Sequence, residues 1–137
     1  MRTIDTIQIG DSASFSKTVT ETDIILYAGI SGDFNSAHID AEAAKSGMFG
    51  QRIAHGMLSA GFISNVLGNQ LPGPGTIYMG QELRFVKPVF IGDTVTATVT
   101  VKEKIEEKNR LKLETVVTNQ KGEPVITGMA TVMPPKA

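Results

Sequence analysis

The decapeptide SGDFNSAHID, residues 31–40, gathers side chains that are suited to acid–base chemistry. It contains two carboxylates, an amide, two serines and one of the two histidines in the chain. Asp33 and His38 form a candidate pair, because histidine changes charge near neutral pH and a carboxylate can hold or relay a proton. Asn35 lies between them. The same residue types are common in turns and at helix ends, so a purely structural role is the competing interpretation.

For three polar residues we favour a structural role over a functional one. Asp40 directly precedes AEAAKS, which predicts a helix cap. His55, the second histidine, is expected to fix the start of the next helix, and Ser64 on that helix can bond back to a carbonyl one turn earlier. A metal site made of His38, Asp40 and His55 rests on spacing alone, so we predict none. Without cysteine there is no thiol nucleophile or thiolate ligand.

Two predicted helices flank the decapeptide. From Thr20 onward, apolar residues recur with helical spacing, and Thr20 with Asp23 resembles a capping box. Glycines at 29 and 32 are expected to end this helix, which makes 31–40 a loop. A short helix is predicted to follow at AEAAKS.

The segment AHGMLSAGFISNVLGNQL, residues 54–71, predicts a helix that is apolar on nearly every side and therefore buried all round. Residues 1–19 fit one or two short edge strands. After the turn LPGPGT, residues 77–133 carry strand patterns, and valine or alanine alternates with threonine in DTVTATVTVKEKI. The breaks EEKN and NQKGE predict an antiparallel meander. These patterns predict an α+β fold in which a curved antiparallel sheet wraps around one long helix.

Length and charge exclude several classes of function. The chain has 137 residues, which predicts a single domain spanning 1–137. Lysine and arginine total 13 and aspartate and glutamate 14, so nucleic acid and anionic membrane surfaces are not expected partners. No stretch has the roughly 18 apolar residues of a spanning helix, and the N-terminus does not resemble a secretory signal. We expect a cytoplasmic protein.

Several motifs together resemble one known family. YAGISGDFNSAHID is followed by IAHGML, by QLPGPGTIYMGQELRFVKPVFIGD and by GDTVTATV. This combination resembles the MaoC-like hot-dog family, especially its (R)-specific enoyl-CoA hydratases, from about Ile7 to Met133. The resemblance implies a hot-dog fold with a central helix at about 56–70. It also implies a homodimer whose sheets join and whose thioester substrates lie in a tunnel at the interface.

The resemblance also assigns roles to particular residues. It implies addition of water to trans-2-enoyl-CoA, giving (R)-3-hydroxyacyl-CoA, with coenzyme A as part of the substrate and no cofactor. Asp33 and His38 match the catalytic pair, and Asn35 and Ser64 match associated polar residues near the substrate. The backbone amide of Gly56 matches the donor that polarises the thioester carbonyl. This last role suits a helix N-terminus, where amides are unpaired and the dipole is positive, and glycine brings no Cβ.

One departure and several alternatives remain. Ser36 and Ala37 stand where the family often has proline and an aliphatic residue, which predicts a less rigid loop. Which of Asp33 and His38 is the formal base is open. A MaoC-like dehydratase of other hydroxyacyl-CoA thioesters would use the same residues in reverse. A non-catalytic acyl-CoA binding module is the alternative from another class, and a thioesterase is disfavoured because it requires attack at the carbonyl.

Overall fold

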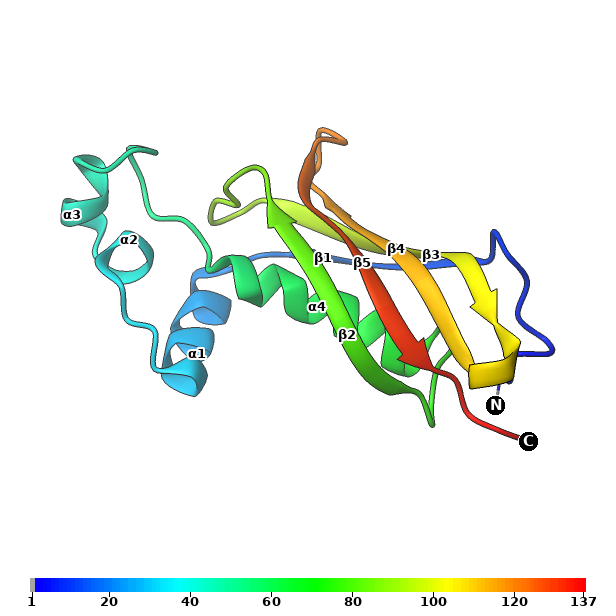
Figure 1. Cartoon of the computed structure of the whole chain (residues 1–137). Helices are drawn as coiled ribbons and strands as arrows, with labels where there is room; N and C mark the ends of the chain where they lie inside the picture. Colours follow the sequence, from blue (N-terminus) through cyan, green and yellow to red (C-terminus); the bar gives the residue numbers. More distant parts are fainter. Residues whose placement is uncertain (1) are drawn as a thin grey trace.

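The computed structural model describes residues 2–137 and shows one sheet, one long helix and three shorter helices beyond the end of the sheet (Figure 1). In chain order the elements are β1 (Ser12–Thr18), α1 (Glu21–Ser31), α2 (Ser36–Ile39), α3 (Ala41–Lys45), α4 (Gly56–Asn69), β2 (Ile77–Phe85), β3 (Thr94–Ile105), the 3-10 helix η1 (Glu106–Lys108), β4 (Arg110–Thr118) and β5 (Pro124–Met133). Within residues 2–137 no helix is long and apolar enough to cross a membrane.

The sheet is antiparallel with strand order β1-β3-β4-β5-β2. The predicted meander is confirmed, because β3, β4 and β5 pair in sequence. The alternation in β3 is also confirmed, since Val95, Ala97, Val99 and Val101 are fully buried. The N-terminal segment forms one edge strand, β1, and β2 forms the other edge.

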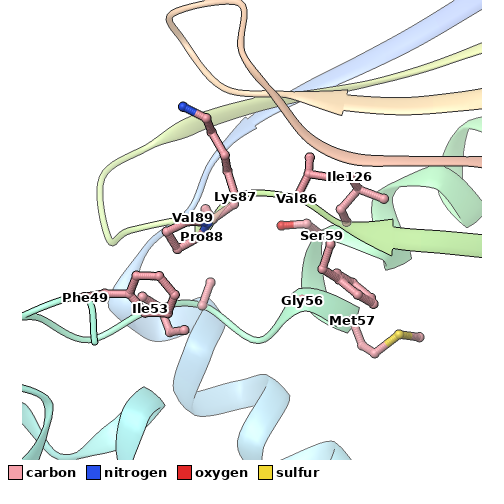
Figure 2. Close-up of a pocket in the computed structure, with 12 residues that line it drawn as sticks. Phe49, Ile53, Gly56, Met57, Ser59, Val86, Lys87, Pro88, Val89 and Ile126 are labelled. Atoms are coloured by element: carbon pink, nitrogen blue, oxygen red, sulfur yellow. The ribbon is translucent and has the colours of Figure 1, made fainter. Parts of the chain in front are cut away.

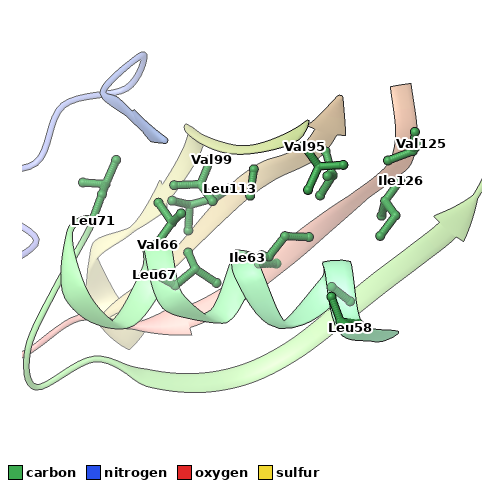
Figure 3. Packing of buried hydrophobic residues seen from close by; sticks show 14 of the residues in the cluster. Leu58, Ile63, Val66, Leu67, Leu71, Val95, Val99, Leu113, Val125 and Ile126 are labelled. Carbon is green, nitrogen blue, oxygen red and sulfur yellow. The ribbon is translucent and has the colours of Figure 1, made fainter. Parts of the chain in front are cut away.

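Helix α4 packs lengthwise on the concave face of the sheet (Figure 3). Its side chains Leu58, Ile63, Val66 and Leu67 point into the core formed with the sheet, and each is nearly inaccessible. Burying one such side chain contributes about 1.5–3 kcal/mol, so this helix anchors the fold. The predicted range, 56–70, agrees with the observed one.

The expectation that α4 is buried all round is wrong within this chain. Met57, Gly61 and Ser64 lie on one face of the helix and are exposed, because their spacing of three to four residues turns them away from the sheet. The strip carries no charged side chain, so nothing in the sequence indicated that this face of the helix is exposed. The chain therefore covers α4 on the sheet side and leaves a strip open.

The caps predicted around the decapeptide are confirmed. Thr20 and Asp23 form a capping box at α1, and Asp40 accepts hydrogen bonds from the amides of Glu42 and Ala43 at the start of α3. Helix α1 runs through Gly29 and ends at Gly32, whose φ of 81° lies in the left-handed region.

The expectation that residues 31–40 form only a loop is wrong. Ser36–Ile39 forms the helical turn α2, with Asn35 as its N-cap. Sequence periodicity could not show this helix, because one turn is too short to display a period. His38 therefore projects from a helical turn.

Gly128 provides a test of the sheet. A Cβ at Gly128 on β5 would lie 1.8 Å from the carbonyl oxygen of Glu82 on β2, so the two strands would have to separate. We expect Gly128→Ala to lower the free energy of unfolding by about 1–3 kcal/mol, as overpacking does, measured by urea denaturation. Gly29→Ala is the matched control: it meets nothing within 4 Å in α1 and is expected to stabilise by about 0.5–1 kcal/mol. Equal effects of the two changes would show that β2 and β5 do not approach so closely at Gly128.

Candidate active site

The site forms where the segment carrying α2 returns to the start of α4. His55 is the N-cap residue of α4 by position, yet its side chain makes no capping hydrogen bond. Instead its Nε2 lies 2.8 Å from the backbone carbonyl oxygen of Asp33, to which it donates. The ring is almost completely buried and also packs against Tyr27, with ring centroids 4.8 Å apart. His55 thus ties the Asp33 segment to the helix that follows it.

The chain at Arg52 and Ile53 holds His38 in place. Arg52 Nε donates to the carbonyl oxygen of His38 at 2.7 Å, and Arg52 also pairs with Glu21 on α1. The Ile53 amide donates to the Ala37 carbonyl at 3.1 Å, and the carbonyl of Ile53 lies 2.8 Å from His38 Nδ1. Since a carbonyl only accepts, Nδ1 carries a proton in this bond. In the neutral ring, Nε2 is therefore left with its lone pair, which suits a base.

Asp33 is exposed and lies beside the two histidines. A carboxylate oxygen of Asp33 and one ring nitrogen from each of His38 and His55 lie within 4.8 Å of one another. One carboxylate oxygen accepts from the Asn35 amide at 3.2 Å, and the Asp33 amide donates to Ser31 Oγ at 3.1 Å. The carboxylate is thereby held at the mouth of the site with acceptor capacity left over.

This cluster favours proton transfer over metal binding. The rings of His38 and His55 are stacked, with centroids 3.9 Å apart and planes inclined by 26°. A metal bound at about 2.0–2.1 Å needs imidazole lone pairs that converge in the ring planes. Stacked rings direct their lone pairs side by side, and one nitrogen of each ring already faces a carbonyl.

Gly56 follows His55 directly and begins α4. Its amide belongs to the first turn, and among residues 2–137 no acceptor is bonded to it. A Cβ at this position would lie 2.6 Å from two ring carbons of Phe85. A side chain here would meet the Phe85 ring unless that half-exposed ring moved, and glycine leaves the first-turn amide open next to His55.

The remaining predicted residues lie apart from the cluster or cap its helices. Asn35 Oδ1 accepts from the Ala37 amide at 2.9 Å, so this oxygen caps α2. Ser64 lies two turns into α4 and lines a surface cavity of about 330 Å³ with Tyr78 and Gln81. Asp40 caps α3, as the structural interpretation predicted.

Sequence reasoning missed Arg52 as a contact of His38 and the role of the His55 ring. No short sequence pattern could have indicated these contacts. Both partners of Arg52 lie more than ten residues away in the sequence, and so does the partner of His55. The histidine pair at the ends of the segment 38–55 was the one available hint.

The comparisons with known proteins decide the family. A family model described as "MaoC like domain" matches residues 6–129. The chain belongs to the MaoC-like family. Among curated members it is 56% identical over 129 residues to the (R)-specific enoyl-CoA hydratase of Rhodospirillum rubrum, covering 94% of this chain and 89% of the relative.

Solved MaoC-like structures agree with the fold. The unliganded R-hydratase of Pseudomonas aeruginosa superposes with a TM-score of 0.93 at 43% identity, covering 98% of this chain and 86% of that one. The (R)-hydratase from Aeromonas caviae, described as involved in PHA biosynthesis, gives 0.91 at 42% identity, covering 94% and 98%. The expected hot-dog fold is confirmed by these neighbours.

The departure at Ser36 has a defined place in this MaoC-like chain. Ser36 is the first residue of α2, where proline is favoured because its missing N–H is not needed. Asn35, which precedes it, has φ −53° and ψ 135°, a conformation that a following proline permits. The site is therefore compatible with the proline that the family often carries.

We expect Ser36→Pro to raise the free energy of unfolding by about 0.4–1 kcal/mol, because it restricts the unfolded chain without removing a hydrogen bond. Ala37→Pro is the matched control. It removes the amide that Asn35 caps and is expected to destabilise by about 0.5–2 kcal/mol. Urea denaturation of both variants gives the comparison, and destabilisation by Ser36→Pro would show that α2 is not held as described.

Proposed function

We propose that this chain is an (R)-specific enoyl-CoA hydratase, which adds water to trans-2-enoyl-CoA and gives (R)-3-hydroxyacyl-CoA. The observation that carries the proposal is the hydrogen bond of His38 Nδ1 to the Ile53 carbonyl, which leaves Nε2 as a base next to the Asp33 carboxylate. The high identity to a curated (R)-specific hydratase supports the same reaction. Coenzyme A enters as part of the substrate.

His38 and Asp33 both act on the attacking water, His38 as the base and Asp33 as a hydrogen-bond acceptor. His38 Nε2 takes one proton from the water while the oxygen forms a bond to C3 of the enoyl group, and the Asp33 carboxylate accepts a hydrogen bond from the other water hydrogen. The electron pair of the C2–C3 double bond moves toward the thioester carbonyl. The proton on His38 then passes to C2, which restores the thioester and the neutral imidazole. A positioned acid–base pair of this kind contributes about 10²–10⁴ in rate.

Gly56 supplies the donor for the charge that develops on the carbonyl oxygen. Its amide is unpaired within the described chain and lies at the positive end of α4. One preorganised donor of this type contributes about 2.7–4 kcal/mol to the transition state. The dehydration of the hydroxyacyl thioester uses the same three groups in reverse order.

We also propose that the enzyme works as a homodimer joined at the β2 edge. Within residues 2–137, β2 pairs on one side only, with β5. Ile77, Tyr78 and Met79 are exposed on this strand, and Met57 is exposed on the adjoining open strip of α4. A second copy that extends the sheet would pair the free strand edge and cover the strip.

The activity is tested with crotonyl-CoA and the variants Asp33→Asn and His38→Gln. We expect each variant to lower kcat about 10²–10⁴-fold while keeping the folded state, checked by circular dichroism. Asp40→Asn is the control, because asparagine caps a helix as well as aspartate and Asp40 lies outside the chemistry. Coupling to a dehydrogenase specific for (R)-3-hydroxyacyl-CoA identifies the product. Wild-type rates in both variants, or an S product, would contradict the proposal, and a wild type that binds crotonyl-CoA without hydrating it would point to a non-catalytic acyl-CoA binding module.

The dimer is tested by sedimentation velocity. We expect the wild type to sediment as a dimer and the double variant Ile77→Asp, Met79→Asp as a monomer with reduced activity, because two buried charges at the interface would have no partners. Ile9→Asp is the control, an exposed isoleucine near the N-terminus and away from β2. A monomeric wild type at micromolar concentration would overturn the assembly and leave the acid–base proposal standing.

A further inference from the structure

A second cavity opens beside Gly56 (Figure 2). Its volume is about 400 Å³, and its walls come from the segment before α4, the first turn of α4, the segment after β2 and the strand β5. These walls are mainly apolar and include Phe49, Ile53, Val86, Pro88 and Ile126. Lys87 contributes its aliphatic stem, while its ammonium group points away and pairs with Glu123 at 2.5 Å. The interior therefore carries no charged group.

One polar side chain faces this interior without a partner. Ser59 is 1% exposed, and among residues 2–137 its Oγ has no hydrogen-bond partner. A helical serine can satisfy its hydroxyl on the carbonyl one turn earlier, but Ser59 does not. Its oxygen points into the cavity in Figure 2. A buried unpaired hydroxyl is unfavourable, so its presence points to an occupant that forms a hydrogen bond with it.

The cavity lined by Ser64 differs, because within the described residues it has no buried side-chain polar atom without a partner. Its polar groups are largely satisfied within the chain, because Tyr78 donates to Gln81, and the Gln81 amide donates to Thr115 Oγ1 at 2.8 Å. Ser64 itself is exposed. Met57 lines both cavities, so both open from the first turn of α4, next to the Gly56 amide. A thioester whose carbonyl lies at Gly56 can thus extend one arm into each cavity.

From this geometry we propose that the Ser59 cavity binds the pantetheine arm of the substrate, with the Ser59 hydroxyl hydrogen-bonded to one of its amide groups. This inference rests on the proposed enoyl-CoA hydratase function and deepens it. Pantetheine is a narrow, uncharged chain of methylene and methyl groups interrupted by amides, which matches an apolar, uncharged cavity with one buried hydroxyl. An alkyl acyl chain offers that hydroxyl no partner, so it belongs in the other cavity.

The test compares Ser59→Ala with the wild type on three thioesters: crotonyl-CoA, crotonyl-pantetheine and S-ethyl thiocrotonate, which has no amide. Loss of one neutral hydrogen bond formed in both ground and transition states should raise KM about 3- to 10-fold with kcat unchanged. We expect this rise for the first two substrates and equal kinetics of variant and wild type on the ethyl thioester. The melting temperature of the free variant should not fall, because the hydroxyl it loses is unpaired.

Ser14→Ala on the exposed face of β1 is the control and should leave every value unchanged. Calorimetry with butyryl-CoA, which has no double bond to hydrate, separates this inference from the proposed reaction. Weaker binding of butyryl-CoA to Ser59→Ala supports the subsite even if the wild type hydrates no enoyl-CoA. Equal binding and kinetics in variant and wild type would overturn it, as would an equal defect on the ethyl thioester, which would place the hydroxyl against the acyl half.

Discussion

The site depends on the hydrogen bond from His55 Nε2 to the carbonyl of Asp33, together with the stacking of His55 on His38. The segment between α1 and α4 holds only two very short helices, which are not stable on their own. It projects beyond the sheet and cannot bury itself in the main core (Figure 1). His55 is buried and immediately precedes α4, so its ring links the segment that carries Asp33 and His38 to the helix of the core.

Two adjacent residues at the start of α4, His55 and Gly56, have separate structural roles. His55 holds the Asp33 carbonyl and stacks on His38, and within residues 2–137 the neighbouring Gly56 amide has no acceptor. The lack of a side chain at Gly56 has a second cause that sequence reasoning did not give, since the Phe85 ring occupies the space of a Cβ. Phe85 is the last residue of β2, so the sheet brings its ring against the backbone at the start of α4. The start of α4 therefore contacts both the sheet and the segment that carries Asp33.

The sequence predicted the parts of this molecule that follow local rules. The capping box at Thr20, the cap at Asp40 and the alternation in β3 are short-range patterns, and the structure confirms them. It could not predict the turn α2, the contact of Arg52 with His38 or the ring of His55 on Asp33, because these depend on segments brought together by the fold. Residue types and the family resemblance both predicted Asp33 and His38 as a pair, whereas the bond of His38 Nδ1 to the Ile53 carbonyl is visible only in the folded chain.

Unsatisfied polar atoms gather at this end of α4 and nowhere in the main core of the described chain. His55 Nδ1 and Ser59 Oγ are the two buried side-chain atoms without a partner in the described chain, while the buried Thr115 Oγ1 in the sheet accepts a hydrogen bond from Gln81. A core selected only for stability would have replaced such groups with apolar ones, because an unpaired buried polar atom costs about 1–3 kcal/mol. Their concentration within one helical turn of Gly56 distinguishes two regions of the helix. Its C-terminal part packs apolar side chains against the sheet, and its N-terminal end keeps the two buried polar atoms that have no partner within the described chain.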